Sequence, residues 1–286
     1  MISEERFKEE LETIIANAIK EDIGSGDHSG MACIERHVKG KARLLVKEDG
    51  VLAGVNAAEA IFNKIDDELI IEKHIHDGQR IVHGDVAFFV SGKSHSILEA
   101  ERIVLNTMQR MSAIATKTRK FVSALEDTPA QILDTRKTTP GFRAMEKWAV
   151  KIGGGVNHRY GLYDMIMLKD NHIDFCGGID KALEKTIAYL TKNKLDLNIV
   201  VEARDLKEIA EILEYHKHVE RILLDNFTYE KTEEAVKMIG SNCQTESSGG
   251  ITLETAPKYA NCGVDFISSG ALTHSVCNLD LSLKAL

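Results

Sequence analysis

After residue 130 the chain alternates short apolar runs with longer stretches of helical spacing, and this rhythm limits the fold more than any other feature. The runs are QILD (131–134), MIMLK (165–169), NIVVE (198–202), RILLD (221–225), CQTES (243–247) and VDFIS (264–268). The later runs recur at spacings of roughly 22 residues, which is typical of repeated βα units. Continuous apolar strands suit a parallel sheet that is covered on both faces. These units predict an α/β barrel short of eight strands, or a doubly wound sheet.

The first 125 residues follow a different pattern. Residues 5–20 place apolar side chains at helical spacing, and the glycines of EDIGSGD (21–27) end that helix. Short β-like runs between 41 and 91, separated by Gly and Asp, predict a small α+β region with a largely antiparallel sheet. Residues 97–125 lack Gly and Pro and predict a long helix with one buried face. Its other face is left open to a dimer interface.

Composition narrows the functional classes. The chain of 286 residues carries 36 Lys and Arg against 44 Asp and Glu, a net charge of −8, which argues against nucleic acid or an anionic membrane as partner. No apolar run approaches the ~18 residues of a membrane span, and the acidic N-terminus does not resemble a signal peptide. Five cysteines without a CxxC pair predict free thiols in a reducing cytoplasm. We therefore expect a cytoplasmic protein.

Polar residues follow every one of the six predicted strands. In order along the chain they are Asp134-Thr135-Arg136-Lys137, Lys169, Glu202, Asp225, Ser248-Gly249-Gly250 and Ser269-Gly270. In α/β barrels the active site lies at the C-terminal ends of the strands. The pattern therefore predicts an active site formed by these strand ends.

The window from Thr135 to Lys169 is basic within an acidic chain, with seven Lys or Arg and two acids, a net +5. Three of its cations, Arg143, Lys147 and Lys151, share one side of a predicted helix, and we expect them to form a solvated face. The others lie at strand ends or in the loop GGGVNHRYG; they are Arg136, Lys137, Arg159 and Lys169, accompanied by His158. Such a group predicts a site for a small polyanion.

The remaining strand ends add two elements. SSGG and SSGAL follow the last two strands, where small residues allow backbone N–H groups to approach a phosphate. Glu202 and Asp225 could accept hydrogen bonds from sugar hydroxyls, hold Mg²⁺ or stabilise a developing cation, or could simply pair with neighbouring lysines. Nucleophile-elbow, P-loop and HExxH motifs are absent from the sequence. The set predicts group transfer between anionic small molecules by positioning and electrostatics.

The segment DTRKTTPGFRAMEKWAVKIGGGVNHRYGLYDMIMLKDNHI (134–173) resembles the signature of the quinolinate phosphoribosyltransferases. Further segments that resemble family motifs are EDIGSGD, ERIVLN (101–106), VVEARDL, LLDNF, ESSGGIT, SSGALTHS and LDLSLKAL. The resemblance implies an N-terminal α/β sandwich domain over 1–114, to which 275–286 returns. It also implies a barrel domain with fewer than eight complete strands over 115–274.

The resemblance further implies that the chain joins quinolinate to 5-phosphoribosyl-1-diphosphate in NAD biosynthesis, giving nicotinate mononucleotide, diphosphate and CO₂. It implies Mg²⁺, no organic cofactor, and a homodimer or higher oligomer in which Arg102 reaches the neighbouring active site. Lys137, Glu202 and Asp225 are the expected catalytic residues, the two carboxylates also being the expected Mg²⁺ ligands. The expected substrate-binding residues are these three with Arg102, Thr135, Arg136, His158, Arg159, Lys169, Ser248, Gly249, Gly250, Ser269, Gly270, Ala271 and His274.

Two positions depart from the family pattern: Val200 stands where the first Glu of Val-Glu-Val-Glu is expected, and Asp27-His28-Ser29 alters the N-terminal loop. Four alternatives were weighed. They are a molybdenum-associated paralogue, a nicotinate-type phosphoribosyltransferase, an aldolase that uses Lys169 as a Schiff-base lysine, and a non-catalytic binding protein. The intact NHR and LKDNH segments favour the first reading over the paralogue, and the cation cluster favours it over the nicotinate enzyme.

Overall fold

The computed structural model describes residues 3–286 and contains two compact units. The barrel unit comprises residues 120–136 and 155–271. The N-terminal unit comprises the described residues up to 119 together with 137–154 and 272–286. The chain therefore passes from one unit to the other between Arg136 and Lys137 and returns after Gly154.

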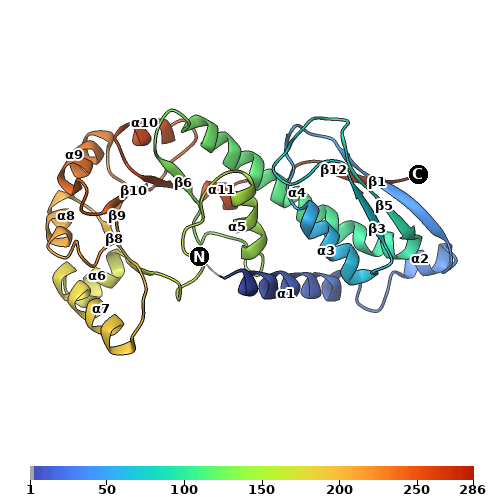
Figure 1. Cartoon of the computed structure of the whole chain (residues 1–286), viewed down its shortest axis with the longest axis horizontal. Coiled ribbons are helices and arrows are strands. Elements are labelled where there is room, and N and C mark those ends of the chain that lie inside the picture. The colour runs from blue at the N-terminus through green and yellow to red at the C-terminus, as the bar shows by residue number, and fades with distance from the viewer. Residues whose placement is uncertain (1–2) are drawn as a thin grey trace. The chain divides into compact units, whose positions relative to one another are not determined.

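The N-terminal unit is built on a four-stranded antiparallel sheet, which confirms the predicted small α+β region (Figure 1). Its strands lie in the order β12 (Leu281–Ala285), β1 (Lys39–Val46), β5 (Val86–Lys93) and β3 (Ile70–Lys73). A short ribbon joins β2 (Gly50–Val51) and β4 (Arg80–Ile81), and the first two helices are α1 (Glu4–Asp22) and α2 (His28–Cys33). Helix α3 (Val55–Ile65) packs on the sheet through an edge-to-face contact of Phe62 with Phe88. The final strand β12 pairs with β1, so the C-terminal residues belong to this sheet.

Helix α4 (Ser94–Ala124) is the long helix expected over 97–125. Val104, Met108 and Met111 are fully buried, as the spacing predicts. Burial extends to Ser112, whose hydroxyl donates to the carbonyl oxygen of Ala53 and accepts from its N–H. The helix is therefore covered over more of its circumference than the apolar positions alone indicate.

The prediction of a solvated face on the helix after Pro140 is wrong. In α5 (Arg143–Ile152) Lys147 is only 3% exposed, and Arg143 is half-buried with its Nε donating to the Thr138 hydroxyl; Lys151 alone of the three is exposed. The helix packs against α1, where Trp148 meets Phe7 edge to face at 5.3 Å. Elements from distant parts of the chain thus cover a side that looked free in the sequence.

The barrel unit contains a six-stranded parallel sheet, which confirms an α/β barrel with fewer than eight strands. The strands lie in the order β6 (Gln131–Leu133), β11 (Phe266–Ser268), β10 (Gln244–Ser248), β9 (Arg221–Asp225), β8 (Ile199–Ala203) and β7 (Ile166–Leu168). From β7 to β11 each strand lies beside the next one in the chain. This constant direction of winding places the connecting helices on one face, whereas a doubly wound sheet reverses direction.

Helices surround the outside of these strands in Figure 1. They are α6 (Asp170–Cys176), α7 (Ile179–Asn193), α8 (Leu206–Leu213), α9 (Tyr229–Ile239) and α10 (Ala256–Asn261), and the short α11 (Ala271–His274) follows β11. Below the strand ends, Met167, Val200 and Leu223 form an apolar cluster. Val200, the departure from the family pattern, is completely buried in it.

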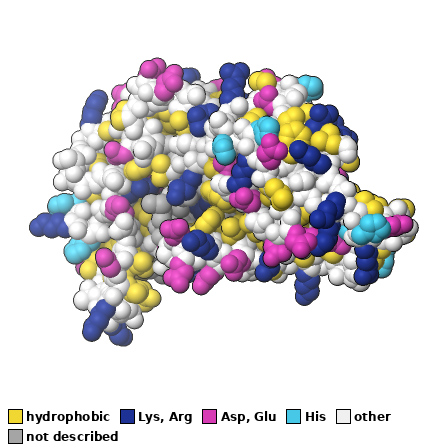
Figure 2. Space-filling view, turned by 45° about the vertical axis from the view of Figure 1, so that its right-hand side comes forward, with side chains coloured by type: hydrophobic (Ala, Val, Ile, Leu, Met, Phe, Trp, Pro, Cys, Tyr) yellow, Lys and Arg dark blue, Asp and Glu magenta, His cyan; other side chains and the backbone are white. Residues whose placement is uncertain are grey.

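Figure 2 shows acidic and basic side chains interspersed over one face of the molecule, in keeping with the mixed composition of 36 basic and 44 acidic residues. Among residues 3–286, no helix has the length and apolar character needed to cross a membrane. The five cysteines are free thiols, as the sequence predicts.

Candidate active site

The parallel strands of the barrel unit bring the predicted polar residues to one end of the sheet. Ser248 at the end of β10 is paired in register with Asp225 at the end of β9, and Glu202 of β8 is paired with Leu223 of β9. Lys169 directly follows β7. These side chains lie within 48 to 79 positions of one another at most only through the fold, because no local turn connects them.

Glu202 and Lys169 form an ion pair, with Lys169 Nζ 2.6 Å from Glu202 Oε2. The glutamate side chain is 6% exposed and lies one pleat above Val200, while the lysine side chain is 46% exposed. The carboxylate is therefore held between an apolar layer and a solvent-accessible cation. An anion that attracted the ammonium group would leave Glu202 free to accept hydrogen bonds from another ligand.

Arg136 and Arg159 are two cations that repel one another. Burial lowers the pKa of the Arg159 guanidinium, the charge of Arg136 lowers it further, and Asp164 offsets part of the shift. Arg159 is 8% exposed, and its Nη1 donates to the carbonyl oxygen of Met165. Arg136 Nε is buried and has no acceptor among the described residues. Two guanidinium groups held together in this way, one with an unused donor, are suited to a dianionic ligand.

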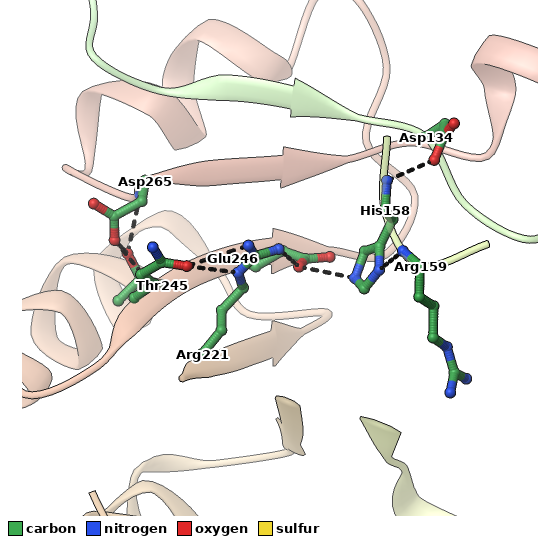
Figure 3. A network of polar contacts seen from close by, with 8 residues as sticks. Asp134, His158, Arg159, Arg221, Thr245, Glu246 and Asp265 are labelled. Carbon is green, nitrogen blue, oxygen red and sulfur yellow. Dashed lines mark hydrogen bonds and ion pairs between the residues drawn. The ribbon is translucent and has the colours of Figure 1, made fainter. Parts of the chain in front are cut away.

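The segment Asn157–Arg159 is tied to two strands by buried carboxylates (Figure 3). Asp134, just after β6, is fully buried and accepts the His158 main-chain N–H at 2.8 Å and the Asn157 amide at 2.6 Å. On β10, Glu246 Oε2 lies 3.3 Å from His158 Nε2 and 3.0 Å from Arg221 Nη1. The position of Arg159 at the strand ends therefore depends on both carboxylates.

Glu246 and Arg221 belong to this site and were missed from the sequence. The signal that could have found them is a charge inside an otherwise apolar strand, because a charge buried in a sheet covered on both faces has to be paired. Arg221 opens RILLD, and Glu246 lies in CQTES and opens the family-like segment ESSGGIT. The analysis of strand ends passed over both, since they lie below the ends.

The loops after β9 and β10 lock together. The Asn226 N–H donates to Ser248 O at 2.9 Å, and Asn226 and Gly249 both have positive φ, 56° and 99°. A Cβ on Gly249 would lie 3.0 Å from the Asn226 nitrogen and closer still to its side-chain amide. Gly250, also at positive φ, has open space around it. The loop therefore exposes backbone that a small ligand such as a phosphate can approach closely.

The last strand ends contribute short polar side chains. Ser247 Oγ is buried and has no hydrogen-bond partner in the described structure. The Ser269 hydroxyl donates to Ile251 O at 3.1 Å, while Gly270 and Ala271 are half-buried at the start of α11. Asp225 is half-buried, and one of its oxygens accepts the Asn226 amide at 2.8 Å.

Other predicted residues lie close to the boundary or in the N-terminal unit. Arg102 is exposed on α4, Thr135 is half-buried, and Lys137 is exposed with its carbonyl oxygen accepting the Thr273 hydroxyl at 2.7 Å. His274 is exposed, with Nδ1 2.6 Å from the Ser275 hydroxyl. These contacts describe each residue within its own unit.

An ion pair inside the N-terminal unit holds the loop that begins with Lys137. Glu146 of α5 is fully buried, accepts Nε and Nη2 of Arg110 at 3.0 and 2.8 Å, and accepts both the N–H and the hydroxyl of Thr139. Arg110 also donates to Thr273 O. Since Thr273 bonds Lys137, the backbone of this loop is anchored at two points.

The donor set at the strand ends limits the kind of metal site. No group of three or more His, Cys, Asp or Glu side chains with metal-binding arrangement occurs in residues 3–286. Glu202 and Asp225 supply carboxylates alone. Mg²⁺ is commonly held by one or two carboxylates together with water and substrate phosphates, so these residues fit a magnesium ion that arrives with a phosphorylated substrate.

Comparison with known proteins follows the geometry. Residues 114–284 match the family model for the C-terminal domain of quinolinate phosphoribosyl transferase, and residues 27–112 match that for its N-terminal domain. A tobacco protein, "Quinolinate phosphoribosyltransferase [decarboxylating] 1b" of Nicotiana tabacum, is 47% identical over 96% of this chain and 82% of its own. The "Probable nicotinate-nucleotide pyrophosphorylase [carboxylating]" of Bacillus subtilis is 39% identical over 96% and 93%.

Solved structures agree. The crystal structure of NadC from Streptococcus pyogenes is 36% identical and has a TM-score of 0.90, covering 100% of this chain and 99% of its own. Human nicotinic acid phosphoribosyltransferase is only 10% identical with a TM-score of 0.62 over 90% of this chain and 72% of its own, a likeness of fold alone.

Proposed function

This chain belongs to the quinolinate phosphoribosyltransferase family, and we propose that it catalyses the reaction named by its relatives. Quinolinate receives the phosphoribosyl group of 5-phosphoribosyl-1-diphosphate and loses its 2-carboxylate. The products are nicotinate mononucleotide, diphosphate and CO₂, on the route of NAD biosynthesis. The observation that carries this proposal is the pair Arg136 and Arg159, two mutually repelling guanidinium groups with an unused donor at strand ends.

Quinolinate binds in this proposal through its two carboxylates. Arg136, Arg159 and Lys169 attract the dianion, because desolvated guanidinium and ammonium groups bind carboxylates strongly. When Lys169 turns to the substrate, its present partner Glu202 is released. Glu202 and Asp225 then accept the ribose hydroxyls, and their negative charge favours positive charge at C1 of the ribose.

The chemistry follows from this placement. The C1–O bond to diphosphate breaks with its electron pair, and the pyridine nitrogen forms the new bond to C1. The ring then carries a positive charge and accepts the electron pair left at C2 when the 2-carboxylate departs as CO₂. A proton from solvent completes C2. The cations hold the carboxylate in place, and the surrounding apolar layer of Met167, Val200 and Leu223 limits water below it.

The phosphate ends of the phosphoribosyl substrate suit the remaining residues. Ser248, Gly249 and Gly250 with Ser269, Gly270 and Ala271 offer hydroxyl and backbone donors. Lys137, which follows Arg136 in the chain, and His274 are assigned to diphosphate and phosphate on the family resemblance. Mg²⁺, held by Glu202 and Asp225 through the substrate, would neutralise charge on the leaving diphosphate.

The alternatives have less support. A Schiff-base lysine needs a desolvated site, whereas the Lys169 side chain is 46% exposed and ion-paired. Relatives named as quinolinate enzymes, at 39–47% identity, favour the quinolinate reaction over that of a molybdenum-associated paralogue. A cytoplasmic location accords with five free thiols.

The test is a direct assay. With Mg²⁺ and 5-phosphoribosyl-1-diphosphate, we expect equimolar release of diphosphate and CO₂ with quinolinate, and no CO₂ with nicotinate. Turnover of nicotinate without decarboxylation, or covalent trapping of Lys169 by borohydride in the presence of a carbonyl substrate, would overturn the proposal. Chelation of Mg²⁺ should abolish diphosphate release, with Ca²⁺ as a control for charge alone.

The dimer can be tested separately. We propose that Arg102, exposed on α4, completes the active site of a neighbouring subunit. Arg102→Ala and Arg159→Ala should each be inactive, but a mixture should recover up to about a quarter of wild-type activity, because a mixed dimer retains one complete site. The absence of any recovery, with mixed dimers demonstrated by native mass spectrometry, would show that Arg102 acts within its own subunit.

A further inference from the structure

Glu246 is a buried carboxylate that the proposed reaction does not use. It lies in the middle of β10 and is completely buried. Burial by itself would raise the pKa of the Glu246 carboxyl, but the hydrogen bond and charge of His158 and the charge of Arg221 outweigh burial and hold that pKa below its ordinary range. A charged carboxylate in this position is costly unless it has a structural or functional use.

The groups that face Glu246 come from three strands and one loop. Arg221 of β9 lies 3.0 Å away, is held by the side chain of Gln244, and stacks on the ring of Phe266 at 3.9 Å. Ser268 of β11 also contributes to lowering the pKa of Glu246. His158 is the other titratable group beside it. Arg221 therefore balances the charge of Glu246, and the second interaction of the carboxylate is with the imidazole.

The imidazole of His158 lies between Glu246 and the backbone of Arg159 (Figure 3). Its Nδ1 accepts the Arg159 N–H at 2.7 Å, and its Nε2 lies 3.3 Å from Glu246 Oε2. A nitrogen that accepts a hydrogen bond cannot carry a proton, so the proton of the ring is on Nε2, toward the carboxylate. Glu246 thereby selects the tautomer whose other nitrogen can hold the Arg159 backbone.

Arg159 needs such an anchor because its guanidinium repels that of Arg136. Without a ligand the two groups would separate if the loop could move. The loop is pinned at residue 158 from two sides, by Asp134 on the main chain and by Glu246 on the ring. In Figure 3 the Arg159 guanidinium points away from this network, free of both carboxylates.

We propose that Glu246 is a positioning residue for anionic substrate, which fixes the tautomer of His158 and through it the backbone that carries Arg159. The inference rests on the proposed function, in which Arg159 binds a quinolinate carboxylate. It predicts that Glu246 controls the affinity for the dicarboxylate and leaves binding of the phosphoribosyl substrate nearly unchanged.

The first test needs no variant of Glu246. Nitrogen-15 NMR of histidine-labelled wild-type protein, with the His158 signals assigned by their loss in His158→Gln, should show a protonated Nε2 and an unprotonated Nδ1 at neutral pH. A His158 that carries its proton on Nδ1 would overturn the proposal. This measurement is independent of catalysis, so it stands even if quinolinate is not the substrate.

The second test separates positioning from general stability. Glu246→Gln is expected to raise KM for quinolinate about tenfold while KM for 5-phosphoribosyl-1-diphosphate changes less than about twofold, and to mix the His158 tautomers. The matched control is Asp265→Asn, on the segment leading into β11, because Asp265 bonds the N–H and hydroxyl of Thr245 without touching His158. This control should leave both KM values and the His158 signals unchanged.

Unchanged quinolinate KM in Glu246→Gln, or equal changes for both substrates in Glu246→Gln and Asp265→Asn, would contradict a positioning role. If Glu246→Gln does not fold, Glu246→Asp keeps the charge with a shorter reach, and the same selective rise in quinolinate KM is expected. A wild-type protein with no activity on quinolinate but the predicted His158 tautomer would reject the proposed function and retain the structural half of the inference.

Discussion

Lys169 Nζ lies 2.6 Å from Glu202 Oε2, and these two residues come from neighbouring strands whose ends form the candidate site. The pair joins a cation suited to quinolinate with a carboxylate suited to ribose. It therefore couples the two proposed substrate positions before either substrate is bound.

Replacing Lys169 by Met should lower kcat/KM by about 30-fold or more, because a charged contact to the dianion is lost. The substitution also leaves Glu202 buried without a cation, which should cost about 1–3 kcal/mol of unfolding free energy. Steady-state kinetics and urea denaturation measure the two effects. Lys192→Met on the exposed surface of α7 is the control and should change neither. A double-mutant cycle with Glu202→Gln should give non-additive losses.

Arg136→Gln should weaken quinolinate binding and stabilise the fold. Loss of the guanidinium removes repulsion from Arg159, so we expect a gain of about 0.5–1 kcal/mol in unfolding free energy, as is common when a strained functional residue is replaced. KM for quinolinate should rise by about tenfold or more. Near-wild-type kcat/KM for quinolinate would refute the assignment of Arg136 to the substrate.

The two glycines after β10 form a matched pair. Gly249→Ala places a Cβ against Asn226, whereas Gly250→Ala meets open space; both occur at positive φ. Gly250→Ala should cost about 1 kcal/mol through backbone strain alone. Gly249→Ala should cost more and should also raise KM for 5-phosphoribosyl-1-diphosphate, because its loop has to shift. Equal Tm losses in the two variants would argue against the close approach of Asn226.

The ion pair of Arg110 with Glu146 should be the stronger of two anchors in the N-terminal unit. Glu146→Ala removes a fully buried carboxylate with four hydrogen bonds and should cost about 3–5 kcal/mol. Arg119→Gln, which loses one bond to Gly153 O, should cost about 1 kcal/mol. Urea denaturation followed by circular dichroism compares them, and similar losses would contradict the assigned importance of Glu146.

Stability should fall in acid partly because of Glu246. Its pKa lies below the ordinary 4.5 in the folded protein, so its contribution is present above pH 4.5 and is lost as the pH falls through the lowered value. Urea midpoints measured from pH 7 downward should therefore converge for wild type and Glu246→Gln at the acid end. A difference that stays constant over this range would show that the Glu246 carboxyl is not held ionised by folding.

The sequence by itself determined the class of fold and the identity of the strand-end residues. Apolar runs at regular spacing predict parallel strands because a covered sheet admits few polar side chains, and the polar residue after each run marks its exposed end. Asp225, Ser248 and Glu202 could be placed in this way. The pairing of β12 with β1 was expected from family resemblance and could not be derived from the residues of the closing segment.

Only the tertiary structure decided which charged groups face one another. Glu246, Arg221 and His158 come from β10, β9 and a loop, and their contacts depend on strand register and on the side of the sheet to which each residue points. Lys147 looked solvated because its helix was judged alone, yet α1 covers that helix. Burial and charge pairing arise between segments that are distant in the chain, so a local pattern records the residues and leaves their partners open.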